Sequence, residues 1–509
     1  MVVRMFTARS LLIITSLLLL IGLVACGQAP APGAVTAVSI DQDDRTIAVG
    51  GSFALSATVT AAGGAAETVT WTSSDEAVAT VSSAGVVEAV GVGDTTITAT
   101  STFDPSRSDT IQITTDLPGS ALWAHQFGTS EYEYPSGVAV DAAGNVIVVG
   151  DTDGDYGGPN KGDSDAFVTK IGSSGTPLWK HQFGTDVWDF ASGVAVDSAG
   201  DIIIAGVTDG DLDGPSAGNA DAFVVKLGSD GSPVWTRQFG TTENDYVYDV
   251  AVDSDDDILV AGYTFGVLGD SSAGLADVFV TKFDSAGNRV WTHQFGSSDQ
   301  DYAYGVAVDS NDSILVVGYT GGNLGGPNAG GSDVFVSKID ADGTPDWTHQ
   351  FGSGAADNAV AVALDSDDNI LVAGYTAGNL GSPNAGGQDA FVTKINNGGA
   401  PVWTHQFGTS AGDYAYGVAV DSEDNVLIAG YTAGDLEGSS AGMEDAFVVK
   451  TDSAGSAVWM QQFGTSEWED AAGVAVDPDD RIVIVGSTYG LLGDASAGDS
   501  DVFVRKHLP

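Results

Sequence analysis

Acidic residues recur at one position of a unit that repeats every 56 residues through most of the sequence. The seven members of this column are Glu133, Asp189, Asp245, Asp301, Asp357, Asp413 and Glu469. An aromatic residue follows directly in most units, as Tyr134, Phe190, Tyr246, Tyr302 and Tyr414. Carboxylates beside aromatic rings can bind cations or hold a sugar, and two carboxylates at a suitable separation can cleave a glycosidic bond.

The same column has a structural interpretation, in which each acid caps nearby backbone amides and each ring packs between units. We favour it because a feature repeated seven times usually serves the fold, whereas a reaction site is rarely sevenfold. The sequence also contains no G-x-S-x-G elbow, no H-E-x-x-H motif and no phosphate-binding loop. No catalytic residue is therefore assigned, and the seven acids with the four tyrosines are kept as candidate ligand contacts.

Two loops carry acids at alternate positions and break the symmetry of the repeats. They contain Asp151, Asp153 and Asp155 in the first unit, and Asp209, Asp211 and Asp213 in the second. Oxygen ligands at this spacing, with glycine nearby, are similar to the opening of a calcium loop. Neither loop has the distal glutamate of such loops, so calcium and a solvated acidic loop both stay open as interpretations.

Lysine and histidine columns also follow the repeat. The segment D-[AV]-F-V-x-K ends in Lys170, Lys226, Lys282, Lys338, Lys394, Lys450 and Lys506. The aspartate and lysine of one segment lie five positions apart, hence on opposite faces of a strand, so we expect the lysines to pair with neighbouring turns or units. The histidines occur once per unit and are too far apart to share a metal ion.

The repeats predict the fold of residues 118–509. Tryptophan stands at positions 123, 179, 235, 291, 347, 403 and 459, each within W-x-x-Q-F-G. Each unit has four β-like segments and no 3.6-residue pattern, which predicts a propeller blade rather than a helical solenoid. The last unit lacks a following tryptophan segment, so we expect the first one, around Trp123, to complete the seventh blade and close the ring.

The repeat segments also carry a family resemblance. Segments such as GVAVDSEDNVLIAGYT (417–432) resemble the SBBP family of bacterial β-propeller repeats, and the match recurs over residues 121–506. This resemblance implies the fold and little biochemistry. Because neighbouring strands run in opposite directions, the turns from the first to the second and from the third to the fourth strand lie on one face of the propeller, and they are short. The second-to-third-strand loops and the connections to the next blade lie on the other face, which carries the longer loops, so we expect binding on this long-loop face.

Residues 35–116 predict a small β-sandwich, because short alternating segments are separated by Gly, Ser and Asp. The stretch VTWTSSDEAVATVSSAGVVEAVGVGDTTITATS (69–101) resembles the group 2 bacterial Ig-like domain. That resemblance implies a spacer or an adhesive module. The expected fold class is therefore all-β, with an N-terminal Ig-like sandwich followed by a seven-bladed propeller.

The first residues have the pattern of a secretory signal. Residues 1–25 contain Arg4 and Arg9, then an apolar run that is too short for an ordinary membrane span. The quartet Leu-Val-Ala-Cys that ends at Cys26 resembles the lipobox of bacterial lipoproteins, which implies cleavage before Cys26 and its acylation. Residues 26–34 would then be a lipidated tether to the membrane, and the protein would lie in the cell envelope, at the outer membrane or cell surface.

The net charge of −52 limits the candidate partners. A surface this acidic repels nucleic acid and anionic lipid. We expect a non-enzymatic scaffold for binding or adhesion, which contacts an envelope or extracellular protein or a glycan. The alternative is a carbohydrate-active enzyme, a hydrolase or lyase, with acids at the channel mouth.

Overall fold

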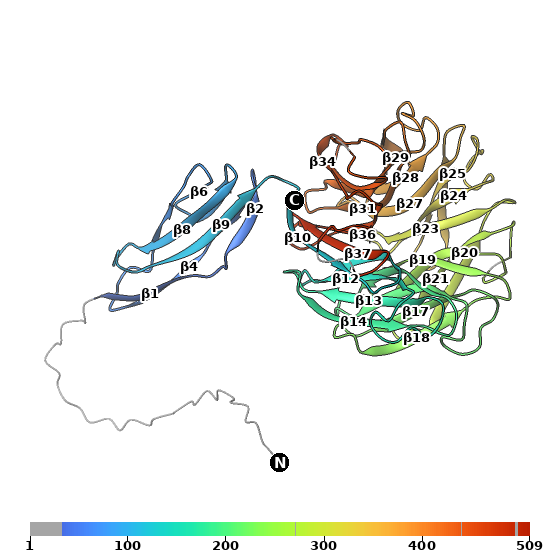
Figure 1. The fold of residues 1–509 in the computed structure, drawn as a ribbon, viewed down its shortest axis with the longest axis horizontal. Helices are drawn as coiled ribbons and strands as arrows, with labels where there is room; N and C mark the ends of the chain where they lie inside the picture. The colour runs from blue at the N-terminus through green and yellow to red at the C-terminus, as the bar shows by residue number, and fades with distance from the viewer. Residues whose placement is uncertain (1–32, 270, 439, 494–496) are drawn as a thin grey trace, which may run out of the picture. The chain divides into compact units, whose positions relative to one another are not determined.

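The computed structural model describes residues 33–269, 271–438, 440–493 and 497–509, and every regular element in these ranges is a β-strand (Figure 1). No helix in the described ranges is long and apolar enough to cross a membrane. The predicted signal at 1–25, Cys26 and the tether up to residue 32 lie outside the described residues. The chain folds into two compact units, which divide between Thr115 and Asp116.

The first unit has the strand arrangement of a small sandwich. Its sheets are β1(Ala34–Ile40) with β4(Ala57–Ala62); β2(Arg45–Ala48), β9(Ser108–Asp116), β8(Gly93–Ser101) and β5(Val69–Ser73); and β3(Ser52–Ala54), β7(Val86–Ala89) and β6(Ala79–Val81). Alternate residues of β8 and β9 are buried, with Ile97, Ile111 and Ile113 at the centre. This period of two is what a sandwich strand needs to place one face on the core.

The second unit consists of seven four-stranded antiparallel sheets, the blades of a propeller. Within each blade the strands run from the innermost, a, to the outermost, d. Blades one to three are β11(Glu133–Val140), β12(Val146–Thr152), β13(Asp165–Ile171), β14(Pro177–Phe183); β15(Asp189–Val196), β16(Ile202–Thr208), β17(Asp221–Leu227), β18(Pro233–Phe239); and β19(Asp245–Val252), β20(Ile258–Thr264), β21(Asp277–Phe283), β22(Arg289–Phe295).

The remaining blades repeat the pattern. Blades four to six are β23(Asp301–Val308), β24(Ile314–Thr320), β25(Asp333–Ile339), β26(Pro345–Phe351); β27(Asp357–Leu364), β28(Ile370–Thr376), β29(Asp389–Ile395), β30(Pro401–Phe407); and β31(Asp413–Val420), β32(Val426–Thr432), β33(Asp445–Thr451), β34(Ala457–Phe463). Blade seven is β35(Glu469–Val476), β36(Ile482–Thr488), β37(Asp501–His507) and β10(Ala121–Phe127).

The seventh blade closes the ring as the sequence predicts. Strand β10 pairs antiparallel with β37, with Trp123 opposite Lys506 and Phe127 opposite Val502. The first tryptophan strand therefore supplies strand d to the three last strands of the chain. This pairing covers an edge of β37 that would otherwise be open to other chains.

The core lies between neighbouring blades. Strands b and c are buried along almost their whole length, apart from residues such as the half-buried Tyr319, because both of their faces pack against adjacent sheets. Strand d is half-exposed. One cluster joins Leu259 and Val280 of blade three to Ile314, Val316 and Phe335 of blade four. The phenylalanine of strand c is fully buried in every blade.

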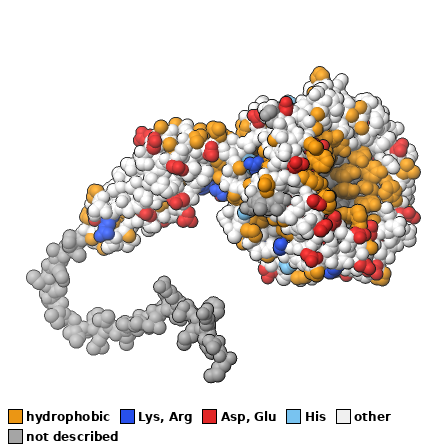
Figure 2. All heavy atoms as spheres, viewed as in Figure 1, with side chains coloured by type: hydrophobic (Ala, Val, Ile, Leu, Met, Phe, Trp, Pro, Cys, Tyr) orange, Lys and Arg blue, Asp and Glu red, His pale blue; other side chains and the backbone are white. Residues whose placement is uncertain are grey.

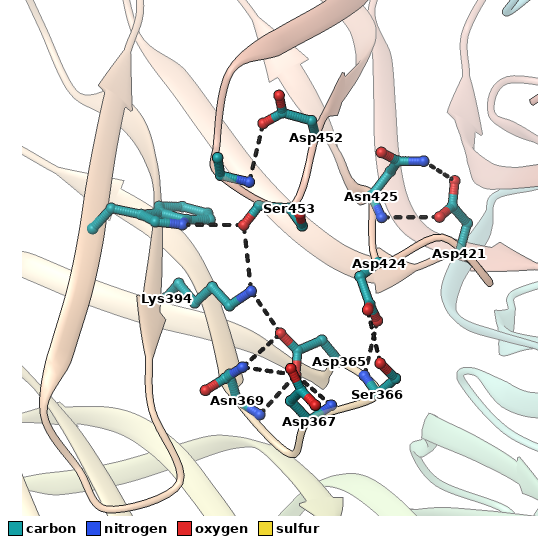
Figure 3. Close-up of polar contacts among 12 residues, drawn as sticks. Asp365, Ser366, Asp367, Asn369, Lys394, Asp421, Asp424, Asn425, Asp452 and Ser453 are labelled. Atoms are coloured by element: carbon teal, nitrogen blue, oxygen red, sulfur yellow. Dashed lines mark hydrogen bonds and ion pairs between the residues drawn. The ribbon is translucent and has the colours of Figure 1, made fainter.

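The short-turn face holds the blades together through charge and hydrogen bonds (Figure 3). Lys394 on β29 pairs with Asp365 of its own blade at 2.6 Å and donates to the carbonyl of Ser453 in the next blade at 3.3 Å. Ser366 donates from its amide and its hydroxyl to Asp424 of the next blade, at 2.9 and 2.7 Å. The lysine column therefore links a strand to turns, within and between blades, as its repetition indicates.

Candidate functional site

The seven acids of the predicted column begin strand a of each blade, and their side chains have no exposed surface. In blade one, Glu133 accepts hydrogen bonds from the amide and hydroxyl of Thr129 at 2.7 and 2.6 Å, and from Thr152 at 2.7 Å. In blade six, Asp413 has the same donors, Thr409 and Thr432. Burial and local caps therefore occupy these carboxylates, which agrees with the structural interpretation of the column.

Each of these acids faces a second carboxylate across the seam between blades. In the seam between blades five and six, Asp389 accepts hydrogen bonds from Gln406 Nε2 and from the amide of Ala385, both at 2.9 Å. A Cβ on Gly408 would lie 2.7 Å from Asp389 Oδ1 and 2.8 Å from Asp413 Oδ2, so only glycine fits. Burial raises the pKa of Asp413, the hydroxyl of Thr432 lowers it, and the nearby Asp389 raises it further. The Q-F-G of the tryptophan motif is therefore structural.

The acids of the predicted calcium loops point to their own loops. Asp155 accepts a hydrogen bond from the amide of Asn160, and Asp211 accepts one from the amide of Ser216, both at 2.8 Å. Asp151 is buried, and its Oδ2 accepts from the hydroxyl of Ser164 at 3.1 Å. Burial raises the pKa of Asp151 to about 7.

The remaining three acids of the predicted calcium loops are Asp153, Asp209 and Asp213. Nowhere in the described ranges do three or more His, Cys, Asp or Glu side chains gather in a way that could hold a metal ion. The contacts of Asp155 and Asp211 with their own loops favour the interpretation as acidic loops, and calcium at these six aspartates stays a prediction.

The predicted aromatic residues belong to a larger group of tyrosines at the inner strands. Strand a of blades three, four and six has a second tyrosine two residues on, at Tyr248, Tyr304 and Tyr416, and strand b adds Tyr263, Tyr319, Tyr375 and Tyr431. The rings touch across blades: Tyr263 to Tyr302 has a centroid distance of 4.4 Å, and Tyr248 to Tyr304 has 4.6 Å. The sequence signals for the missed residues are D-Y-x-Y in strand a and G-Y-T in strand b.

Of the four predicted tyrosines, Tyr134 lines a cavity of about 700 Å³, whereas Tyr246, Tyr302 and Tyr414 do not. The innermost strands of all seven blades contribute to this cavity, so it lies in the central channel. Its tyrosine wall is formed by Tyr248, Tyr304, Tyr319, Tyr375, Tyr416 and Tyr431. The opposite wall has small residues, including Ser136, Ser192 and Ala472. Figure 2 shows a hollow on the propeller lined by hydrophobic side chains, which are orange and include tyrosine. The cavity thus departs from the sevenfold symmetry of the repeat.

Two acids in the cavity wall are unique in their columns. Asp249 stands where the other blades have glycine or alanine; its carboxylate accepts from the amides of Val250 at 2.8 Å and Val306 at 2.9 Å. Burial raises the pKa of Asp249 to about 6. Asp470 stands where most blades have an aromatic ring, and Glu444 lies close enough to act on it electrostatically. Burial first, and then the charge of Glu444, raise the pKa of Asp470 to about 7.

Further aromatic rings lie on the long-loop side of blades one, two and seven. Tyr132 and Tyr134 are parallel at 5.9 Å, and Trp468 meets Tyr489 edge-on at 5.5 Å. Trp468 is 45% exposed, whereas Trp188 is 49% exposed and donates to Asp163 at 2.8 Å. Of these rings, Tyr134 lines the cavity, whereas Trp188 and Trp468 do not.

Comparison with known families agrees with both parts of the fold. The model of the bacterial Ig-like domain (group 2) matches residues 34–110. The model of the SBBP β-propeller repeat matches residues 122–157, 234–269, 290–326, 346–381 and 402–437. The protein therefore has a group 2 bacterial Ig-like domain followed by SBBP β-propeller repeats.

Similar curated proteins cover parts of the chain. An uncharacterized WD repeat-containing protein of Acanthamoeba polyphaga mimivirus is 23% identical over 74% of this chain, and the regulatory protein FlaEY of Caulobacter vibrioides is 27% identical over 43%. The aligned regions span only 36% and 24% of those relatives. Among solved structures, the β-propeller domain of the Trilobed protease from Pyrococcus furiosus has a TM-score of 0.41 and 8% identity, over 74% of this chain and 94% of that one.

Proposed function

We propose that the protein is a non-enzymatic binding scaffold that holds a glycan in the tyrosine-lined cavity of the propeller. A propeller with an Ig-like domain fits a binding scaffold, and the asymmetric tyrosine wall carries the finer proposal. Tyrosine rings offer flat apolar faces for the C–H faces of sugar rings, and their hydroxyls can bond sugar hydroxyls. The cavity volume of about 700 Å³ is in the range of small-ligand sites.

The cavity is also positioned by a rigid frame. Strands a and b, which carry the tyrosines, pair along their whole length and pack against the neighbouring blades. A preformed site loses little conformational freedom on binding, which favours affinity for a flexible glycan. The Ig-like domain then serves as a spacer.

A glycan array with the chain from residue 27 onward tests this proposal. We expect capture of one glycan class and a loss of affinity of about tenfold or more, ~1.4 kcal/mol, for Tyr304→Ala and for Tyr416→Ala. Phe265→Ala is the matched control, because Phe265 is a half-exposed ring beyond the end of strand b and does not line the cavity. Capture that survives both tyrosine changes would overturn the proposal.

A second candidate, a carbohydrate-active enzyme, rests on Glu444 and Asp470. Two carboxyl groups beside a cavity are the kind of groups that supply the acid and the base in glycoside cleavage. The test is turnover on the glycans that the array captures. Turnover abolished by Asp470→Asn would favour the enzyme, and binding without turnover would favour the scaffold.

We also propose that the chain is a lipoprotein anchored in the cell envelope through acylated Cys26. The signal-like residues 1–25 and the lipobox resemblance support this proposal. Metabolic labelling with a fatty acid tests it: the wild-type chain should carry the label in the membrane fraction, and Cys26→Ala should carry none. Unlabelled wild-type chain would refute the anchor without touching the propeller proposal.

A further inference from the structure

An acid–tyrosine cluster lies at the seam of blades six and seven and is formed by Glu444, Asp470, Tyr414, Tyr416 and Tyr431, of which Asp470, Tyr416 and Tyr431 line the cavity. The rings stack on one another, with centroid distances of 4.9 Å between Tyr414 and Tyr431 and 5.8 Å between Tyr416 and Tyr431. Glu444 acts electrostatically on Tyr414 and Tyr431, and Asp470 acts on Tyr416, so the carboxyl pair and the rings are neighbours. Both carboxyl groups are half-buried.

The protein supplies no positive charge to this carboxyl pair. Among the described residues that line the cavity there is no lysine, arginine or histidine. The seven strand-c lysines pair with aspartates of the short turns; examples are Lys394 with Asp365 and Lys450 with Asp421, at 2.6 and 2.8 Å. Asp470 Oδ1 is moreover buried without a conventional hydrogen-bond donor.

No other blade has this arrangement. The residues equivalent to the Glu444–Asp470 pair in the seam of blades four and five are Ser332 and Asn358, which share a neutral hydrogen bond of 2.7 Å. A neutral pair is therefore sufficient for the seam itself. The acids at blades six and seven do something beyond the fold.

We propose that the acid–tyrosine cluster recognises an ammonium group carried by the ligand, either a quaternary amine such as choline or the primary amine of an amino sugar. This inference rests on the proposed function and names the chemical class of its ligand. A cation over the faces of tyrosine rings gains from their quadrupole, and it gains more when carboxylates are adjacent. The overall charge of −52 attracts such a ligand to the protein.

Binding of a cation couples to protonation of the pair. Asp470 faces Glu444 of the preceding loop, Glu469 of its own strand and Tyr416 of β31, and none of these groups is cationic. Because its pKa is raised to about 7, Asp470 is largely protonated in mildly acidic solution, and a bound ammonium must displace that proton to solvent. Affinity for a permanently charged ammonium therefore falls as the pH falls through about 7.

Isothermal titration with choline chloride tests the inference on the chain from residue 27 onward, since the charge of choline does not change with pH. We expect binding that weakens about tenfold from about pH 8 to about pH 5. Asp470→Asn and Glu444→Gln should each weaken binding about tenfold at pH 8 and flatten the pH dependence. The matched control is Glu467→Gln, which removes an exposed acid near the same rim and should change neither property.

A second titration series separates this inference from the proposed function. It compares oligomers of glucosamine, N-acetylglucosamine and glucose on wild-type chain and Asp470→Asn. The ammonium site is supported if the wild-type chain prefers the glucosamine oligomer and Asp470→Asn removes this preference. If all three oligomers bind with equal affinity and this binding depends on Tyr304, the ammonium site is overturned and the glycan scaffold is kept. If choline binds but no oligomer does, the scaffold is overturned instead.

Discussion

The glycine that ends each Q-F-G segment lies against two carboxylates, which leave no room for a larger residue. Gly408→Ala would place a Cβ 2.7 and 2.8 Å from Asp389 and Asp413, which are both buried and locally bonded. We expect a loss in the free energy of unfolding of about 1–3 kcal/mol, because the seam must open or a carboxylate must leave its donors. Urea unfolding measures it. Gly354→Ala is the control, since its Cβ would meet nothing within 4 Å; an equal loss there would refute the explanation.

Asp151 makes the free energy of unfolding depend on pH with a definite sign. Its folded-state pKa of about 7 is above the ordinary value of 3.8, so its contribution is fully present in acid and is lost as the pH rises through about 7. Asp151→Asn keeps a neutral side chain at every pH. We expect the gain in the free energy of unfolding to be larger at about pH 8 than at about pH 5, by on the order of 1–3 kcal/mol, and to vanish only below about pH 4.

Thermal and urea unfolding at the two pH values measure this effect. The control is Asp342→Asn, because hydrogen bonds from Thr344 lower the pKa of Asp342 and it is fully exposed. The explanation of Asp151 would fail if Asp151→Asn destabilised the protein equally at both pH values.

Of the tyrosines that line the cavity, the sequence named only Tyr134 as a candidate and missed those such as Tyr304 and Tyr416. The column of acids was visible, and its favoured interpretation as local caps agrees with buried carboxylates that are bonded by Thr129 or Thr409. Periodicity cannot separate an exposed ring of acids from a buried one, since both repeat once per blade. The cavity tyrosines Tyr319 and Tyr431 stand in the G-Y-T motif of strand b. A strand pattern alone predicts that such tyrosines are core residues.

At the scale of strands and turns, the lysine of strand c ties its blade together. Lys394→Met leaves the buried Asp365 without a counter-charge, and we expect a loss of about 3–5 kcal/mol in the free energy of unfolding. Adding Asp365→Asn should recover part of the loss, because the amide carries no charge. A double-mutant cycle by urea unfolding measures the coupling between the two residues. Additive losses would contradict the ion pair as the cause.

The strands themselves were predictable because apolar and polar residues recur at fixed places. Strand b is a largely apolar run, strand c has an apolar centre between its aspartate and its lysine, and both are mostly buried, while the half-exposed strand d carries the tryptophan motif. The sequence also predicted that the aspartate and lysine of strand c do not pair with each other. It could not predict that Lys394 reaches Ser453 of the next blade, because that contact depends on how the blades are packed.

For the whole molecule, ring closure by β10 predicts an asymmetry between two truncated chains. A chain starting at residue 117 keeps β10, and we expect it to unfold cooperatively near the temperature of the longer chain. A chain starting at residue 128 lacks β10 and exposes the edge of β37, so we expect earlier unfolding and self-association. Thermal unfolding and size-exclusion chromatography measure both effects. Equal behaviour of the two chains would contradict closure by β10.

The central claim is that the tyrosine-lined cavity of the propeller holds the ligand. A crystal structure of the chain with the glycan captured on the array tests it most directly. We predict a sugar ring on the faces of Tyr304, Tyr319 or Tyr416, with any ammonium group beside Glu444 and Asp470. A glycan bound on the Ig-like domain, on the short-turn face or around Trp188, with the cavity empty, would contradict the claim.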